Sequence, residues 1–311
     1  MRALPLLLFP AIALVAAHLT RTTAWVTAFD LTIAIGLCVA SLLTAIAVIG
    51  RFRWLSIFVV AALLVANTGF MLGRISGVKL GPLPPPDARF AILLAAGTLL
   101  GVAGLIARRQ WARWLCLALG TAGFGCGLLN GINFWSVSGG TSNTIYFDWY
   151  CDVCRSENFY LVTALGGAVI VMNLVAARDV FKANASWTSN APVVRWLRAS
   201  MIASFLAVPM LLVYAWMQPL APQTATTAII LAAALTTGAV LGVRGKVVGA
   251  LVLVLAGLGL AAQTIATVML AHDARIAIYY VAFWAPAAVI SVVTGCLLVG
   301  PTVRLLRRLP G

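Results

Sequence analysis

Charged side chains are scarce in this sequence. Only 9% of its 311 residues are Asp, Glu, Lys or Arg, whereas a soluble domain carries about 25%. Hydrophobic residues make up 63%. A soluble core could not hide this much apolar surface, so lipid is the solvent that remains for it. The composition therefore excludes an ordinary soluble protein and predicts an integral membrane protein.

Groups that could perform catalysis are also few. The chain has seven acidic residues and two histidines, which leaves few agents for general acid–base chemistry. It contains no G-x-x-x-x-G-K-[ST], H-E-x-x-H or G-x-S-x-G motif. We therefore lean against an enzyme, assign no catalytic residue and no metal ligand, and leave any cofactor unknown. The net charge of +14 could suit nucleic acid, but the basic residues form short clusters between apolar runs, so no nucleic-acid partner is expected.

The apolar residues form long continuous runs rather than the alternating pattern of barrel strands. In hydrocarbon such runs must be helices, because each backbone polar group needs an internal partner. We predict an all-α, polytopic transmembrane helix bundle of about ten spans, forming a single transmembrane domain over residues 1–311. Each run is about long enough for a bilayer core of roughly 30 Å. The expected spans are 3–20, 24–50, 54–73, 91–107, 114–135, 158–177, 197–217, 226–243, 247–271 and 276–300. The first run also resembles a cleaved signal peptide, which would leave nine spans.

The distribution of basic residues predicts the orientation. Fifteen of the 21 lysines and arginines fall on the side that holds both termini, and such a bias marks the cytoplasmic side. We therefore expect both termini in the cytoplasm of a bacterial-type plasma (inner) membrane, with the loop 136–157 on the outer face. Tryptophan and tyrosine residues near the span ends, including Tyr214 and Trp114, are interpreted as an interfacial belt.

Five spans precede the loop 136–157 and five follow it, so the chain could be a 5+5 inverted repeat. The ten-span plan with cytoplasmic termini resembles the drug/metabolite transporter superfamily in topology alone. No family motif accompanies that resemblance, and we infer no membership from it. Glycines recur at every fourth residue in two spans, a spacing that lets helices approach closely. The fifth span, which holds Gly123, Gly127 and Gly131, is therefore expected to be central, and Gly97 and Gly101 mark the fourth in the same way.

One carboxylate lies within a predicted span. Asp30 is about six residues from the outer end of the second span, a depth of roughly 9 Å at 1.5 Å per residue. A charge at such a depth usually faces a cavity or a partner. Asn67, Asn130 and Gln263 fall at comparable depths. We predict a polar cavity open to the outer face, in which these four residues bind a small solute.

Two alternatives remain open for these residues. The three amides could instead make isolated hydrogen bonds between helices, each worth about 0.6–2 kcal/mol. Asp30 could reach the interface, or pair with Arg21 or Arg74.

The outer loop holds the most distinctive segment, in which Cys151 and Cys154 follow four aromatic residues. Three interpretations compete. In an oxidising compartment the two thiols would form a structural disulfide. A C-x-x-C pair could instead be redox-active. With nearby carboxylates the two thiols could also form part of a metal site, although a single C-x-x-C is weak evidence for zinc.

The leading hypothesis is a permease-like protein that binds or transports a small solute. The alternatives are a membrane thiol–disulfide protein that uses Cys151 and Cys154, and a non-catalytic membrane subunit or assembly factor. The expected partners are the lipid bilayer, a small-molecule solute and other membrane proteins.

Overall fold

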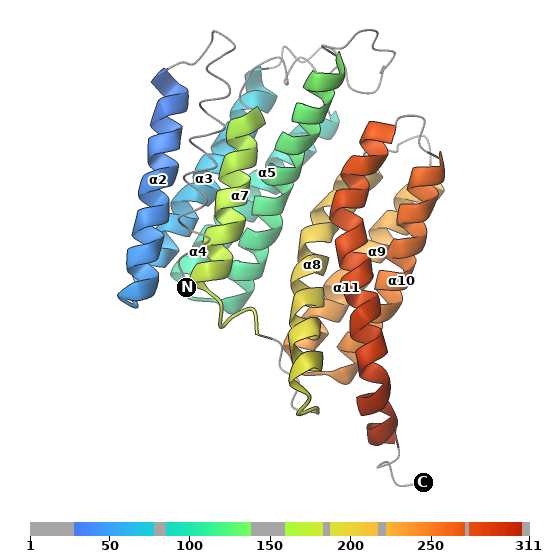
Figure 1. Ribbon diagram of the computed structural model, residues 1–311. Helices are drawn as coiled ribbons and strands as arrows, with labels where there is room; N and C mark the ends of the chain where they lie inside the picture. The colour runs from blue at the N-terminus through green and yellow to red at the C-terminus, as the bar shows by residue number, and fades with distance from the viewer. Residues whose placement is uncertain are drawn as a thin grey trace. The chain divides into compact units, whose positions relative to one another are not determined.

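In the computed structural model, all regular structure in the described part of the chain is helical (Figure 1). The described residues are 28–77, 85–137, 159–182, 187–216, 222–270 and 274–306. Within them lie nine α-helices and no strand, which confirms the all-α prediction for this part of the chain. The helices are α2 (Ala28–Ile49), α3 (Arg53–Gly77), α4 (Pro85–Ile106), α5 (Gln110–Val137), α7 (Phe159–Ala176), α8 (Ala191–Trp216), α9 (Pro222–Val243), α10 (Val247–Leu270) and α11 (Ala274–Leu306).

Several of these helices suit a bilayer. Four stretches are long and apolar enough to cross a membrane: Ala191–Leu212, Ala225–Val243, Val247–Met269 and Val281–Leu298. Four shorter apolar helical stretches precede them: Gly36–Ile49, Arg53–Gly69, Ile92–Ile106 and Thr163–Ala176. The described helices overlap nine of the ten expected spans, and the first, 3–20, lies outside the described residues. The structure thus supports a multi-pass membrane protein, and the full count of ten spans stays a prediction.

The chain divides into two compact units, Met1–Val180 (unit 1) and Phe181–Gly311 (unit 2). The division comes after the sixth expected span, not after the fifth. The 5+5 inverted repeat and the single transmembrane domain therefore remain predictions, and each unit is described by itself.

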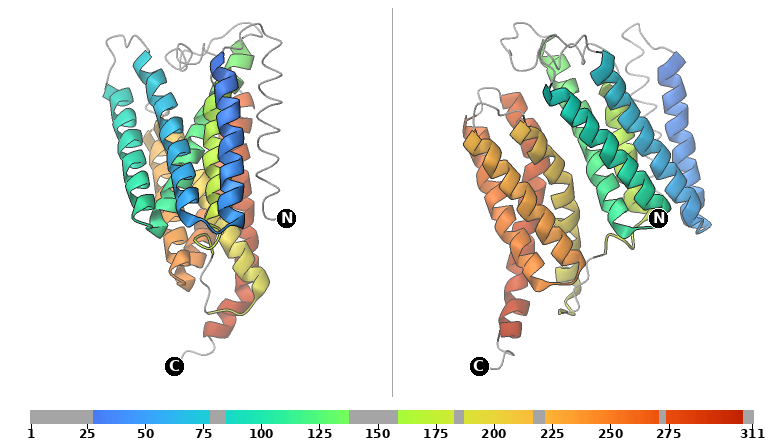
Figure 2. Two further views of the ribbon diagram at one scale, coloured as in Figure 1. Left: turned by 90° about the vertical axis from the view of Figure 1, so that its left-hand side faces the viewer. Right: turned by 180° about the vertical axis from the view of Figure 1, so that it is seen from behind.

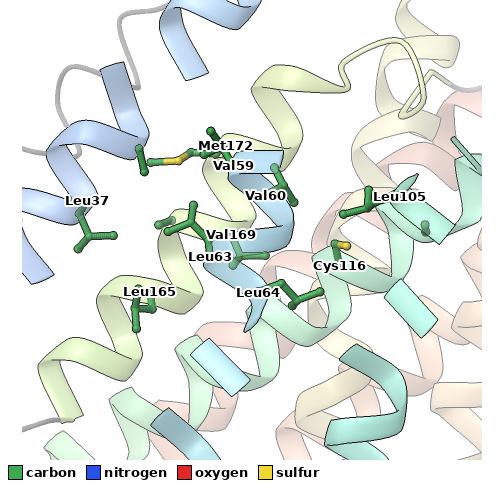
Figure 3. Packing of buried hydrophobic residues seen from close by; sticks show 13 residues of the cluster. Leu37, Val59, Val60, Leu63, Leu64, Leu105, Cys116, Leu165, Val169 and Met172 are labelled. Atoms are coloured by element: carbon green, nitrogen blue, oxygen red, sulfur yellow. The ribbon is translucent and has the colours of Figure 1, made fainter. Parts of the chain in front are cut away.

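Unit 1 is organised around α3 and α5. Helix α3 packs against α2, α4, α5 and α7, and α5 packs against α3, α4 and α7. Within unit 1, the fifth expected span therefore packs against three other helices, and its position in the whole bundle stays a prediction. Figure 3 shows the core between these helices, where buried apolar side chains come from all five of them. Its members include Leu37, Leu64, Leu105, Cys116 and Val169.

Glycines allow the closest approaches in unit 1. A Cβ atom at Gly166 of α7 would overlap the backbone of Phe124 and Gly120 in α5, so the two helices touch backbone to backbone. Gly97 lies against Leu119 of α5, and Gly101 lies against Leu64 of α3. The predicted role of Gly97 and Gly101 in close packing is therefore confirmed.

Unit 2 is a four-helix bundle (Figure 2). Each of its helices packs on the next in the chain, and α11 packs back on α8, as in a bundle with short connections. Ser200 of α8 and Ser291 of α11 are fully buried and share a hydrogen bond of 2.9 Å. Tyr214 of α8 meets the fully buried Trp284 of α11 edge to face, with 5.1 Å between ring centroids.

Two helix pairs are joined by the same tight turn. Arg108, after α4, has a positive φ angle of 55°, and Gly245, after α9, has one of 73°. In each turn the next amide donates to the carbonyl five residues earlier, as Arg109 does to Gly104 at 2.8 Å. This is the Schellman ending, whose left-handed residue is usually glycine.

The outward faces of the helices are apolar. On α2, the exposed residues Val39, Leu42, Ile46 and Ile49 follow helical spacing. Exposed apolar stripes of this kind suit a lipid surface. The predicted aromatic belt holds only in part. Trp54, Trp111 and Trp196 are exposed, as belt residues should be, whereas Tyr214 and Trp114 are 8% and 6% exposed and pack inside their units. Their place near the ends of expected spans did not reveal which helix face they occupy.

Candidate functional site

Asn67 is the predicted site residue whose surroundings are described most fully. It lies on α3 with no exposed surface. Its carboxamide occupies the space beside Gly123 of α5, where a Cβ atom would overlap three atoms of the Asn67 side chain. Asn67 is therefore fitted between α3 and α5. This packing matches the alternative in which the amide is an interhelical polar group.

A polar contact between two threonine side chains involves the residue that follows Asn67 on α3. The hydroxyls of Thr68 in α3 and Thr98 in α4 are 2.6 Å apart and share a hydrogen bond, and both residues are buried. Thr121 of α5 is also buried and donates to the carbonyl of Leu117 at 2.8 Å. The middle of unit 1 is thus crossed by a layer of buried polar groups contributed by three helices.

Asn130 follows Gly123 on the same helix. Seven residues, or two turns, separate them, so their positions lie on the same side of α5. The backbone therefore places Asn130 further along the face of α5 that meets Asn67. The side chain of Asn130 is not among those described.

The helical register also places Asp30. Among residues 36–49 of α2, whose burial is described, the buried ones are Leu37, Ala40, Ser41, Thr44 and Ala47. They form one stripe, and Leu37 belongs to the core shared with α3 and α7. Position 30 is seven residues before Leu37, so it continues the same stripe. Asp30 therefore stands on the side of α2 that packs into unit 1, and its side chain is not described.

Gln263 belongs to unit 2, on α10. It is half-buried, and its amide nitrogen lies 3.5 Å from the hydroxyl of Thr267 on the same helix. The neighbouring Thr264 is buried and donates to the carbonyl of Leu260 at 2.7 Å. Of the four predicted site residues, three thus lie in unit 1 and one in unit 2, so a single cavity holding all four stays a prediction.

Cys151 and Cys154 lie outside the described residues, so their disulfide, redox and metal interpretations all stay predictions. Within the described residues no group of three or more His, Cys, Asp or Glu side chains could hold a metal ion. Cys116 is a free thiol with no exposed surface. It packs in the core of unit 1 as a small apolar side chain, as expected from its place in an apolar run.

The structure reveals one polar cluster that the sequence did not single out. Arg113 of α5 was counted only among the basic residues of the inner side, yet it is 8% exposed. One of its terminal nitrogens donates to Oδ1 of Asn173 in α7 at 3.2 Å, and the other lies 3.5 Å from the hydroxyl of Ser56 in α3. Asn173 lies near the inner end of its expected span, 158–177. An amide at that depth is the one feature of the sequence that could have suggested a polar partner for Arg113.

Comparisons with known proteins identify no relative. No family model, curated protein or solved structure matches the chain.

Proposed function

We propose that this chain is a ten-span, permease-like protein of a bacterial-type plasma membrane that binds or transports a small solute. The solute would enter a polar cavity in the outer half of the bundle. Asp30 recognises the solute or couples its movement to an ion. Asn67, Asn130 and Gln263 supply hydrogen bonds.

The register of α2 is the observation that supports this proposal most. Asp30 shares a stripe with Leu37, which is 2% exposed and packs in the core of unit 1. A carboxylate within a bilayer costs roughly 2.5–3.5 kcal/mol on insertion scales unless water or a partner compensates it. On the lipid side of α2, Asp30 could reach the headgroups directly, whereas on the inward stripe it needs a hydrated cavity or a partner inside the bundle.

The polar layer of unit 1 supports the same arrangement. Asn67 packs on Gly123, and Asn130 lies two turns further along the same side of α5. Asn130 is seven residues nearer the predicted outer end of α5 than Gly123, so it stands at a shallower level than Asn67 and not at the comparable depth expected from the sequence. A solute that entered from the outer face would therefore meet Asn130 before Asn67. Amides and a carboxylate together are suited to a small polar or cationic solute.

Access of water to Asp30 tests the proposal without knowledge of the solute. Asp30→Cys and Asn130→Cys would be made in a chain that lacks its native cysteines, and each labelled in intact cells with a charged, membrane-impermeant thiol reagent. Only a hydrated thiol ionises and reacts rapidly. Leu37→Cys, on the same stripe two turns away, is the buried control, and Leu42→Cys, on the exposed apolar face of α2, is the lipid control.

The proposal predicts rapid labelling at positions 30 and 130 and slow labelling at both controls. Labelling at position 30 as slow as at position 37 would contradict it, because Asp30 would then be packed rather than hydrated.

A further inference from the structure

Arg113 is a buried charge, and among the described residues its hydrogen bonds all involve neutral groups. It lies in the first turn of α5, where α3 also begins and α7 ends. Its guanidinium donates to Asn173 and Ser56, and its own backbone carbonyl accepts from the Asn173 amide nitrogen at 2.7 Å. None of these partners carries a negative charge. A buried charge ordinarily has a counter-charge, because removal from water is expensive.

The chain offers little to neutralise Arg113. The segments predicted to face the cytoplasm contain fifteen lysines and arginines but a single acid, Asp179. Asp179 is exposed and lies three residues after the end of α7. The other six acids lie in or beside segments predicted to face outward. The missing negative charge is therefore expected from outside the chain.

The guanidinium is held in place and keeps donors to spare. An arginine has five N–H donors in a planar fork, and the contacts with Asn173 and Ser56 use two of them. Asn173 forms hydrogen bonds with both the side chain and the backbone carbonyl of Arg113, and these bonds fix the position of the guanidinium. The Ser56 contact, at 3.5 Å, is at the outer limit of a hydrogen bond. Such a contact is easily exchanged for a stronger, charge-assisted bond.

We propose that Arg113, positioned by Asn173, binds a phosphate group at this end of unit 1. A phosphate presents the oxygens that the guanidinium fork pairs with best. Arg53 precedes Ser56 by three residues, and its carbonyl accepts the Ser56 hydroxyl at 2.8 Å. The Ser56 hydroxyl thus donates to Arg53 and accepts from Arg113. The phosphate could belong to an inner-leaflet phospholipid, which basic pockets between helices bind, or to a free anion.

Thermal unfolding of the purified full chain in nanodiscs tests this site. One set of discs contains phosphatidylcholine alone, a second also contains phosphatidylglycerol, and a third is phosphatidylcholine titrated with inorganic phosphate. A ligand that binds only the folded state raises the unfolding temperature. Arg113→Met removes the fork, and Arg109→Met is the matched control, because Arg109 lies immediately before α5, four residues from Arg113, and is exposed.

We expect the unfolding temperature of the wild type and of Arg109→Met to rise by several degrees with the ligand, and that of Arg113→Met to rise much less at the same ligand concentration. Binding should weaken about tenfold or more when Arg113 is lost, as for other hydrogen bonds to a charged group. A rise with phosphatidylglycerol alone would identify a lipid headgroup, and a rise with inorganic phosphate as well would identify any accessible phosphate.

If Arg113→Met fails to fold, Arg113→Lys and Arg109→Lys replace the pair. Lysine keeps the charge but loses the fork, so only the change at 113 should weaken binding. The proposal is overturned if neither ligand stabilises the wild type, or if substitutions at 113 and 109 weaken binding equally.

Discussion

Asn67 fills the space that the absent side chain of Gly123 leaves on the facing helix. The carboxamide lies so close to α5 that any Cβ atom at 123 would overlap it. The amide on α3 and the glycine on α5 therefore form one packing unit. The effect of a substitution at either position on stability should depend on the residue at the other.

Gly123→Ala should lower the free energy of unfolding by about 1–3 kcal/mol, the usual cost of adding atoms to a filled site. Thermal unfolding in detergent would measure it. Gly69→Ala is the matched control, because Gly69 lies two residues from Asn67 and a Cβ atom there meets nothing within 4 Å.

The pairing of Asn67 with Gly123 can also be tested with a double-mutant cycle. Asn67→Ala removes the side chain that Gly123→Ala would strike, so the two losses should be less than additive. Strict additivity would show that the two residues do not share a packing unit.

Gly166→Ala should be more damaging than Gly123→Ala. A Cβ atom at 166 would strike the backbone of Phe124 and Gly120, which cannot turn aside as a side chain can. We expect a larger loss of unfolding free energy, or loss of folded protein, in the same unfolding assay. Gly259→Ala is the comparison, because a Cβ atom there would meet only the end of the flexible Leu231 side chain, 2.7 Å away. Equal effects of the two substitutions would contradict the backbone contact between α5 and α7.

In the two tight turns, we expect substitutions at the left-handed residue to change the free energy of unfolding in opposite directions. Gly245→Ala should cost about 1 kcal/mol, since a left-handed φ is unfavourable for residues with a Cβ atom. Arg108→Gly should gain up to about 1 kcal/mol for the same reason. Denaturant unfolding of both variants checks the prediction, with Arg244→Ala, beside Gly245, as a control expected to change stability by less than about 0.5 kcal/mol. A stabilising Gly245→Ala would contradict the assigned turn geometry.

The apolar runs predict the described helices well, because a bilayer core demands helices about as long as those runs. The pattern is weaker in saying which face of a helix is buried. Tyr214 and Trp114 resemble belt residues in sequence yet pack inside, because both lipid and protein interiors accept aromatic side chains. For Asn67, the sequence predicts a polar role but cannot supply Gly123, which lies 56 positions away in the chain.

Arg113 shows a further limit of prediction from the sequence. A basic residue next to a span is ordinarily a cytoplasmic marker, and nothing local distinguishes a buried arginine from an exposed one. Its burial depends on Asn173, 60 positions away in the chain. That pairing follows from the packing of α5 against α7 and not from either segment alone.

The orientation of the chain underlies both the solute cavity and the phosphate site, and thiol labelling tests it most directly. Cys151 and Cys154 would be kept in a chain without the other four cysteines, then treated in intact cells with a membrane-impermeant maleimide, with and without prior reduction. The account predicts labelling from outside the cell. Labelling only after reduction would identify a disulfide, and labelling without reduction would identify free thiols and favour the redox or metal interpretation. Labelling only after the cells are permeabilised would contradict the account, because the loop 136–157 would then face the cytoplasm.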